Sequence, residues 1–259
     1  MDISNKYIPR EYLALKINYC RKQLAELPEV TLHEHIVDGV PVKRVSTGGH
    51  RYSLNSETGQ QLYKCQIKRD SLERDLHLYE AVWNYNYKGV PPTEFTPRKI
   101  PKKLAVDYNQ RIVMDKTFFE NLKNDANTKH PKTSGYYFNG INYRSAAERE
   151  IAIFYTEMGI PFKYEPEITL LGLPNPINPD FVLYIKELDT CKFHEHLGMK
   201  HSADYIRDTK IKYSNYTGAG LIPDVDILFT HDTEEMPFDI RFLSAKLNSA
   251  IYGTIMNKK

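Results

Sequence analysis

One stretch of the chain, residues 145–252, alternates helix-like and strand-like segments, and their order limits the folds open to it. Ser145 followed three residues later by Glu148 matches a helix capping box, and Gly159 ends the predicted helix. Strand-like runs come next, and helical periodicity then returns twice. The predicted strands span 161–171, 177–185, 191–199 and 224–230, and the later helices span 202–217 and 238–252. The order helix, three strands, helix, strand, helix predicts an α/β (α+β) domain.

The N-terminal half predicts a separate mixed α/β region. A helix is expected over 10–27, where apolar residues recur at helical spacing between two prolines. Two β-prone runs then surround Asp38-Gly39, a dipeptide typical of a tight hairpin turn. A third short strand and a long helix over 57–87 follow.

A linker is predicted over residues 88–103, which are rich in proline and basic residues and cannot continue a helix. A short helix around 112–124 and a polar stretch come after it. We place the domain boundary in that polar stretch. The predicted domains are a basic N-terminal region, 1–128, and a C-terminal domain, 129–259.

Composition excludes several classes of protein. With 41% hydrophobic and 26% charged residues, the chain is an ordinary globular sequence. No apolar stretch approaches the roughly 20 residues that span a bilayer, and the first residues lack a signal-peptide core. We expect a cytoplasmic protein with no membrane partner. The three cysteines are widely scattered, which predicts reduced, structural thiols.

Charge is divided unevenly along the chain. Residues 1–140 carry 22 Lys+Arg against 16 Asp+Glu, a balance of +6, and residues 141–259 carry 13 against 17, a balance of −4. Such a split suits a basic arm that meets an acidic polymer beside a carboxylate-bearing catalytic part, although chance composition also produces it.

Two acidic residues stand at unusual places in the predicted strands. Asp180 follows Pro179 at the head of one apolar run, and Glu195 lies inside the next. Glutamate is poorly suited to strands, and a buried, unpaired carboxylate costs several kcal/mol. A bound metal ion removes that objection. The flanking histidines, His194 and His196, do not form an HExxH motif and alternate to the other face of the strand, which argues against a zinc hydrolase.

Over roughly residues 136–252 the chain resembles the PD-(D/E)XK nuclease superfamily, the restriction-endonuclease-like fold. The resemblance rests on Pro179-Asp180, on Glu195 fifteen residues later and on the preceding helix with Glu148. The phrases "YRSAAE", "FKYEPEITL", "PDF" and "HEHLGM" also look like a bacterial and phage branch in which the third-strand acid is followed by histidine and glycine. The resemblance implies an αβββαβα core.

The same resemblance implies roles for individual residues. Asp180 and Glu195 would hold Mg²⁺, with Mn²⁺ as substitute, because hard divalent cations choose carboxylate oxygens. Glu148 would complete the acidic cluster, and the main-chain carbonyl of His196 is a further candidate ligand. Glu165 is expected as a second-shell acid. Both acids also have a purely structural explanation. Glu148 can simply complete the capping box with Ser145, and Glu165 can simply be a charge at the end of a strand.

The family pattern departs at one position, because Leu197 stands where a lysine is expected. Relatives that lack this lysine take one from the following helix, where this chain has Lys210 and Lys212. We assign Lys210 as the catalytic lysine, since it shares a helical stripe with Ile206 and Tyr213. Lys212 is the substitute candidate. If neither lysine pointed inward, the catalytic assignment would weaken in favour of a protein that binds its partner without cleaving it.

The implied function is a Mg²⁺-dependent DNA endonuclease, with DNA expected as the substrate more than RNA. The alternative is a catalytically inactive nuclease-fold protein that binds nucleic acid or a protein partner. A homodimer would match a symmetric target and is left open. Basic residues beside aromatics can contact a nucleic-acid backbone, although a solvated helix face explains them as well. The candidates are Lys64, Lys68, Arg69, Arg74 and Arg144.

Overall fold

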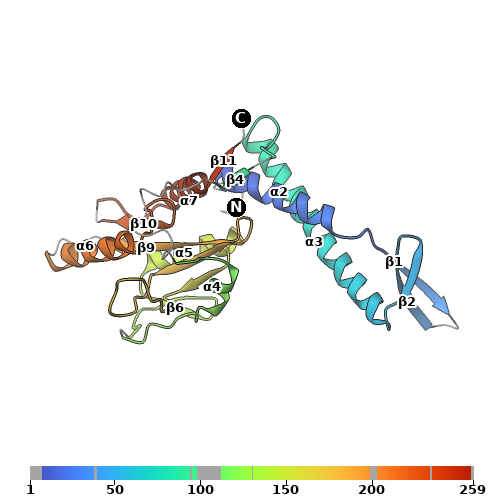
Figure 1. Ribbon diagram of the computed structural model, residues 1–259, viewed down its shortest axis with the longest axis horizontal. Coiled ribbons are helices and arrows are strands. Elements are labelled where there is room, and N and C mark those ends of the chain that lie inside the picture. Colours follow the sequence, from blue (N-terminus) through green and yellow to red (C-terminus); the bar gives the residue numbers. More distant parts are fainter. Residues whose placement is uncertain are drawn as a thin grey trace. The chain divides into compact units, whose positions relative to one another are not determined.

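The structure, a computed structural model, divides into two compact units (Figure 1). One unit, Leu13–Glu94, is called here the hairpin unit, and the other, Met1–Tyr12 with Phe95–Lys259, the mixed-sheet unit. The residues described are 8–37, 40–93, 95–97, 112–129, 131–198, 203–233 and 235–257. The predicted turn at Asp38-Gly39, Ser202 at the start of a predicted helix, and residues 98–103 of the predicted linker lie outside them.

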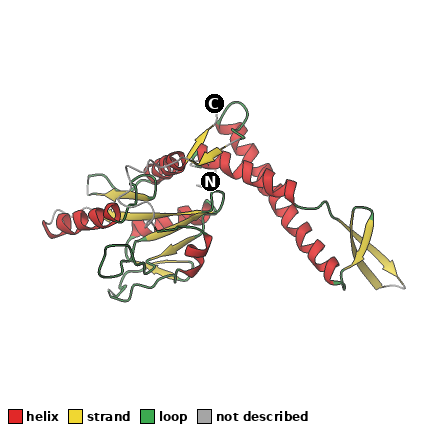
Figure 2. Ribbon diagram, viewed as in Figure 1, coloured by secondary structure: helices red, strands yellow, loops and turns green. Residues whose placement is uncertain are grey.

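The hairpin unit contains the elements expected from the sequence (Figure 2). They are α2 (Arg10–Glu26), β1 (Thr31–Val37), β2 (Val40–Thr47), β3 (His50–Ser53) and α3 (Glu57–Asn86). The first residues of α2, up to Tyr12, belong to the mixed-sheet unit. The strands form an antiparallel sheet in the order β1-β2-β3. The two helices run antiparallel, since Arg21 of α2 pairs with Glu80 of α3 at 2.6 Å, and Arg69 donates to the carbonyls of Leu24 and Leu27.

The mixed-sheet unit carries the predicted order of helices and strands. In chain order these are α5 (Ala146–Glu157), β7 (Phe162–Tyr164), β8 (Phe181–Ile185), β9 (Thr190–Gly198), α6 (Ala203–Gly218), β10 (Ile227–Asp232) and α7 (Ile240–Thr254). The sheet order is β10-β9-β8-β7. β7, β8 and β9 pair antiparallel, and β10 lies parallel to β9. The protein is therefore of mixed α/β class.

Four short strands lie outside this sheet. β5 (Tyr136–Phe138) and β6 (Ile141–Tyr143) form a hairpin, and β4 (Phe95–Pro97) pairs with β11 (Ile255–Asn257). Asn139 and Gly140 connect β5 to β6 with φ of 47° and 81°. This left-handed pair is the turn that the Asn-Gly dipeptide predicts.

The predicted boundary between residues 128 and 129 was wrong. α4 (Lys116–Asn121) belongs to the mixed-sheet unit, because Phe119 packs in the same core as Val182 and Phe193. The polar stretch after α4 is not a linker either. The backbone N–H groups of Asp125 and Ala126 donate to the carbonyls of Tyr164 and Glu165, at 2.7 and 3.0 Å. The polar side chains of this stretch suggested a boundary, although its backbone is hydrogen-bonded to the mixed-sheet unit.

Alternation along the strands divides the sheet into two faces. Phe181 and His194 point to the face that α5 covers, where both pack against Tyr155. Phe193 points to the other face and packs against Tyr216 of α6. In the ranges that the structure describes, no helix combines the length and the apolar character needed to cross a membrane.

Candidate functional site

Asp180, Glu195 and Lys212 line one cavity of about 400 Å³. Asp180 directly precedes β8, Glu195 lies in β9, and Lys212 comes from α6. Phe181 pairs with His194 in the ladder, so the next position along it sets Asp180 opposite Glu195. Side chains at facing positions of antiparallel strands share one face of the sheet. The structure therefore brings together the two acids that the sequence analysis singled out.

Asp180 is held by a backbone donor and surrounded by negative charge. The main-chain N–H of His196 donates to its Oδ2 at 2.7 Å. Burial raises the pKa of Asp180 well above its usual range, and the charges of Glu195 and Glu148 raise it further. Lys212 and the His196 N–H act in the opposite direction. The site has more negative charge than its own cation balances.

Glu195 is enclosed by donors from α6. Only 1% of the residue is exposed. The Lys212 ammonium lies 2.7 Å from its Oε2, and the Tyr216 hydroxyl donates to its Oε1. Burial alone would lower the pKa of Lys212, but attraction to Glu195 and Asp180 raises it above its ordinary value. Lys212 is therefore a permanently charged ammonium fixed beside the carboxylate, with 46% of its side chain still exposed.

The expectation that Lys210 faces inward was wrong. Lys210 is exposed, and so are Ile206 and Tyr213, which were expected to share its inward stripe. The inward stripe of α6 instead runs through Tyr205, Thr209, Lys212 and Tyr216, at spacings of four, three and four residues. This stripe has the helical period, but it starts one residue earlier than the stripe assumed from the sequence.

Glu148 serves the start of α5 and does not line the cavity. Its Oε2 accepts hydrogen bonds from the Arg144 N–H at 3.1 Å and from the Tyr164 hydroxyl at 2.5 Å. Its own N–H donates to Ser145 Oγ, as the capping box predicted. Burial raises the pKa of Glu148. Its charge reaches Asp180, and its Oε2 is held by these two donors.

Arg144 and Glu165 form a second charged pair in the cavity wall. The guanidinium binds both carboxylate oxygens, with Nε 2.6 Å from Oε1 and a terminal nitrogen 3.1 Å from Oε2. Lys132 lies 3.1 Å from the same carboxylate, and Asn127 donates to it. Glu165 is thus a buried anchor for Arg144. Arg144 lines the cavity, which fits its predicted place near a substrate.

The histidines of β9 point away from the acids, as strand alternation predicted. His194 contacts Tyr155 Oη through Nδ1 at 2.8 Å and Thr230 Oγ1 through Nε2 at 2.7 Å. His196 Nδ1 contacts the same Thr230 oxygen at 2.9 Å. Burial, and then the charge of His196, lowers the pKa of His194 to about 3. These imidazoles are neutral parts of the core.

The basic residues proposed on α3 have different surroundings. Lys68 donates to Gln23, and Arg69 binds carbonyls of α2 and the carboxylate of Glu73. Arg74 donates to the carbonyl of Asp70 one turn earlier. Lys64 is exposed. Lys68 and Arg69 thus link α3 to α2, which is a structural role for this basic face.

Tyr216 and Tyr164 are site residues that the sequence analysis did not select. Each hydroxyl donates to one of the predicted acids, Tyr216 to Glu195 and Tyr164 to Glu148. Tyr216 stands four residues after Lys212 on the same helix, so helical spacing was a usable signal. Tyr164 lies on β7, and only the tertiary structure brings it to α5.

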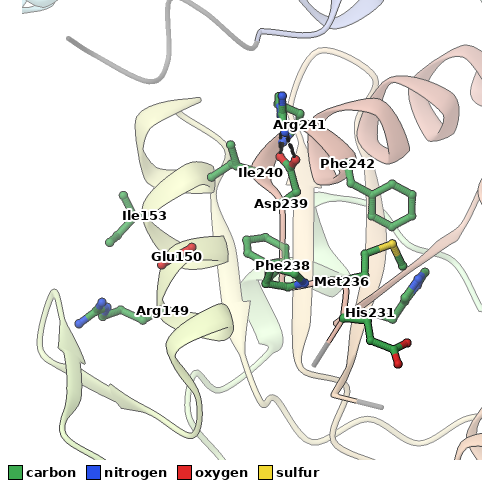
Figure 3. Close-up of a pocket in the computed structure, with 12 residues that line it drawn as sticks. Arg149, Glu150, Ile153, His231, Met236, Phe238, Asp239, Ile240, Arg241 and Phe242 are labelled. Atoms are coloured by element: carbon green, nitrogen blue, oxygen red, sulfur yellow. Dashed lines mark hydrogen bonds and ion pairs between the residues drawn. The ribbon is translucent and has the colours of Figure 1, made fainter. Parts of the chain in front are cut away.

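A larger cavity, of about 880 Å³, opens between α5 and the start of α7 (Figure 3). Met236, Phe238 and Phe242 are among its apolar side chains, and Arg241 pairs with Asp239 at 2.5 Å. None of the predicted site residues lines it. The candidate site is therefore assigned by its chemistry and not by the size of the cavity.

Within the described ranges, no group of three or more His, Cys, Asp and Glu side chains is arranged to hold a metal ion. Asp180 and Glu195 form a carboxylate pair, and Lys212 adds a positive side chain at hydrogen-bond distance from Glu195. Comparisons with protein-family models, with curated proteins and with solved structures found no match to this chain.

Proposed function

We propose that this protein is a Mg²⁺-dependent nuclease that cleaves DNA. One observation carries the proposal: Asp180, directly before β8, lies opposite Glu195 of β9, with the Lys212 ammonium 2.7 Å from Glu195. Two acids and a lysine on adjacent strands and the next helix are the constellation that the PD-(D/E)XK resemblance implies. The lysine missing at Leu197 is supplied from α6.

The arrangement of elements supports the same proposal. Glu195 lies in the central strand β9, Asp180 directly precedes the central strand β8, and β10 returns parallel to β9 after α6. This connection puts α6 over the face that carries Glu195, so its inward stripe delivers Lys212 and Tyr216 to one carboxylate. The proposed nuclease core therefore needs no residue from the hairpin unit.

The residues present fit a magnesium ion. Mg²⁺ is commonly held by one or two carboxylates and keeps several water ligands, so Asp180 and Glu195 suffice as its anionic ligands. The His196 carbonyl is a third candidate. The excess negative charge that raises the pKa of Asp180 is the electrostatic situation that a divalent cation relieves. When bound, the ion would supply Lewis acidity toward a phosphate oxygen.

The remaining side chains have roles that follow from their contacts. Lys212 presents a charged ammonium where negative charge develops on the phosphate, or orients the attacking water. Tyr216 fixes Glu195 through its hydroxyl, and the His196 N–H fixes Asp180. Arg144, anchored by Glu165, places its guanidinium in the cavity wall, where it would contact a substrate phosphate.

Two matched substitutions on one helix test the proposal. Lys212→Met should lower the rate of Mg²⁺-dependent cleavage of supercoiled plasmid by about 10²-fold or more, the usual cost of losing a positioned charge or general acid–base group. Lys210→Met removes the same charge from the exposed side of α6 and should cut like wild type. Asp180→Asn should abolish cleavage, and EDTA should do so for wild type.

Several results would sink this proposal. Full metal-dependent cleavage by Asp180→Asn would exclude the site, and loss of activity in Lys210→Met but not in Lys212→Met would reassign the lysine. A wild-type protein that binds DNA but cuts neither plasmid, linear duplex nor single strands, with Mg²⁺ or Mn²⁺, would favour the inactive, binding-only alternative. Running the same variants on RNA decides between the two substrates.

A further inference from the structure

The sheet of the hairpin unit has a face that α3 partly covers, called here the covered face, and an opposite, open face. Coverage is local, since Ile36, farther along the covered face, is 78% exposed. α3 contacts all three strands, and Val45 on β2 is fully buried. Leu32 and Tyr52 are the ladder partners of Val45, so they share its covered face. Alternation turns the neighbouring residues of each strand to the other face. That open face is exposed or half-buried along its whole described length.

Two adjacent cross-strand rows of the open face consist only of hydrogen-bonding side chains. The first row joins Thr31, Ser46 and Arg51, and the second joins His33, Arg44 and Ser53. His33 Nε2 lies 2.7 Å from Ser46 Oγ, which links the rows. Guanidinium, imidazole and hydroxyl groups are the usual partners of phosphate oxygens.

The open face carries positive charge without acidic neighbours. Arg44 and Arg51 are exposed, and among the described residues neither forms an ion pair. No Asp or Glu lies on the open face in the described parts of the three strands; Glu34 points to the covered side and faces Lys43 across the ladder. Each guanidinium is therefore available to an anion.

Toward its other end, the open face carries ring and aliphatic side chains. The rings of His33 and His35 stack at a centroid distance of 6.0 Å and an interplanar angle of 6°. Val37 and Val40, a ladder pair, are 49% and 61% exposed. Rings and small apolar groups of this kind contact sugars, thymine methyl groups and base edges, whereas the arginines contact the backbone.

We propose that the open face of the β1-β2-β3 sheet is a DNA-binding surface that holds the substrate of the proposed nuclease. Charge complementarity selects the occupant: in the described part of the sheet this face carries no acid and two arginines without an ion pair, beside hydroxyls, which fits a polyanion. The major groove of duplex DNA admits a two-stranded β-ribbon, which the β1–β2 pair of this sheet supplies. The inference rests on the proposed function only in that the bound DNA is taken to be the substrate, because the test measures binding without cleavage.

The test measures binding of the full-length protein to a fluorescent DNA duplex in EDTA, by anisotropy over a series of salt concentrations. Arg44→Gln/Arg51→Gln should weaken binding several-fold and reduce the slope of log Kd against log salt by about 2, since each lost phosphate contact removes about 0.9. The control, Lys22→Gln/Lys43→Gln, removes two exposed charges of the same unit away from the open face. It should leave the slope near its wild-type value.

Equal losses in the two double variants would overturn the proposal, because they would show a response to net charge alone. Unchanged binding in the arginine variant, or no binding of duplex or single-stranded DNA by wild type, would overturn it as well. Circular dichroism of both variants should match wild type, since all four side chains are exposed. The two proposals can fail separately. If Asp180→Asn still cut DNA while the arginine variant lost salt-dependent binding, the DNA-binding surface would stand and the proposed catalytic site would not.

Discussion

Glu195 owes its buried charge to donors that come from a single helix. Lys212 and Tyr216, four residues apart on α6, each reach one of its oxygens. A carboxylate with 1% exposure needs such partners, because an unpaired buried charge costs several kcal/mol. The protein itself therefore offsets part of the cost of burying a glutamate inside a strand, before any metal binds.

Tyr216→Phe should destabilise the metal-free protein by about 1–3 kcal/mol, because it leaves a buried carboxylate oxygen without its donor. Urea unfolding in EDTA measures this change. Tyr213→Phe on the same helix is the control, since Tyr213 is 42% exposed and its ring keeps its stacking on Phe229 without the hydroxyl. Equal effects of the two substitutions would contradict the proposed role of the hydroxyl.

Sequence periodicity predicted the wrong rotation of α6 about its own axis. α6 has apolar residues on its exposed side, with Ile206, Ile211 and Tyr213 at 51%, 50% and 42% exposure. A stripe drawn through such residues points to Lys210. The observed inward stripe is partly polar, because it faces the carboxylates rather than an apolar core. Amphipathic patterns locate the core side of a helix and mislead where a helix covers a polar site.

The junction between β3 and α3 is the tightest point of the hairpin unit. A Cβ on Gly59 would lie 1.9 Å from the carbonyl oxygen of Ser53, which also accepts a bond from the N-cap residue Ser56. Gly59→Ala should destabilise the hairpin unit by about 1–3 kcal/mol or more, because backbone must shift to admit the methyl group.

Thermal unfolding followed by circular dichroism measures the Gly59→Ala effect. Ser71→Ala is the matched control, since it adds alanine at an exposed position of the same helix. It should be neutral or slightly stabilising. If Gly59→Ala melted like wild type, the close approach of β3 to α3 would have to be wrong.

At the scale of the whole molecule, buried ionisable groups set how stability depends on pH. Folded Asp180 keeps its proton to higher pH than the unfolded chain does, because burial and Glu195 raise its pKa. Above the ordinary carboxyl pKa of about 3.9 the folded protein therefore binds more protons, and its stability falls as pH rises through the raised value. His194, with its pKa lowered to about 3, acts in the opposite direction below pH 6.5.

Asp180→Asn isolates the carboxylate, since His194 titrates in both proteins. In EDTA the variant should melt at a higher temperature than wild type near neutral pH, and the difference should shrink as pH falls toward 4. Mg²⁺ should stabilise wild type and not the variant, because only the intact pair binds the ion. Asp208→Asn, an exposed change on α6, should show neither effect. Differential scanning fluorimetry over pH would show a constant difference if Asp180 were not buried among charges.

The sequence by itself determined most of the helices and strands, though not β4 and β11, and the residues at the centre of the candidate site. Capping residues and periodicity are local signals, so they located α5 and the order α5 to α7. Asp180 and Glu195 were identified because an acid at a strand position is anomalous on local grounds alone. Their roles in catalysis and metal binding stay predictions.

Only the tertiary structure decided which lysine meets Glu195, which residues belong to each compact unit, and which basic side chains remain available to a partner. Lys212, rather than Lys210, depends on the rotation of α6 about its axis, which its contacts with β9 fix. The assignment of α4 depends on Phe119 packing with strands far along the chain. These outcomes rest on contacts between residues distant in sequence, and no local pattern encodes them.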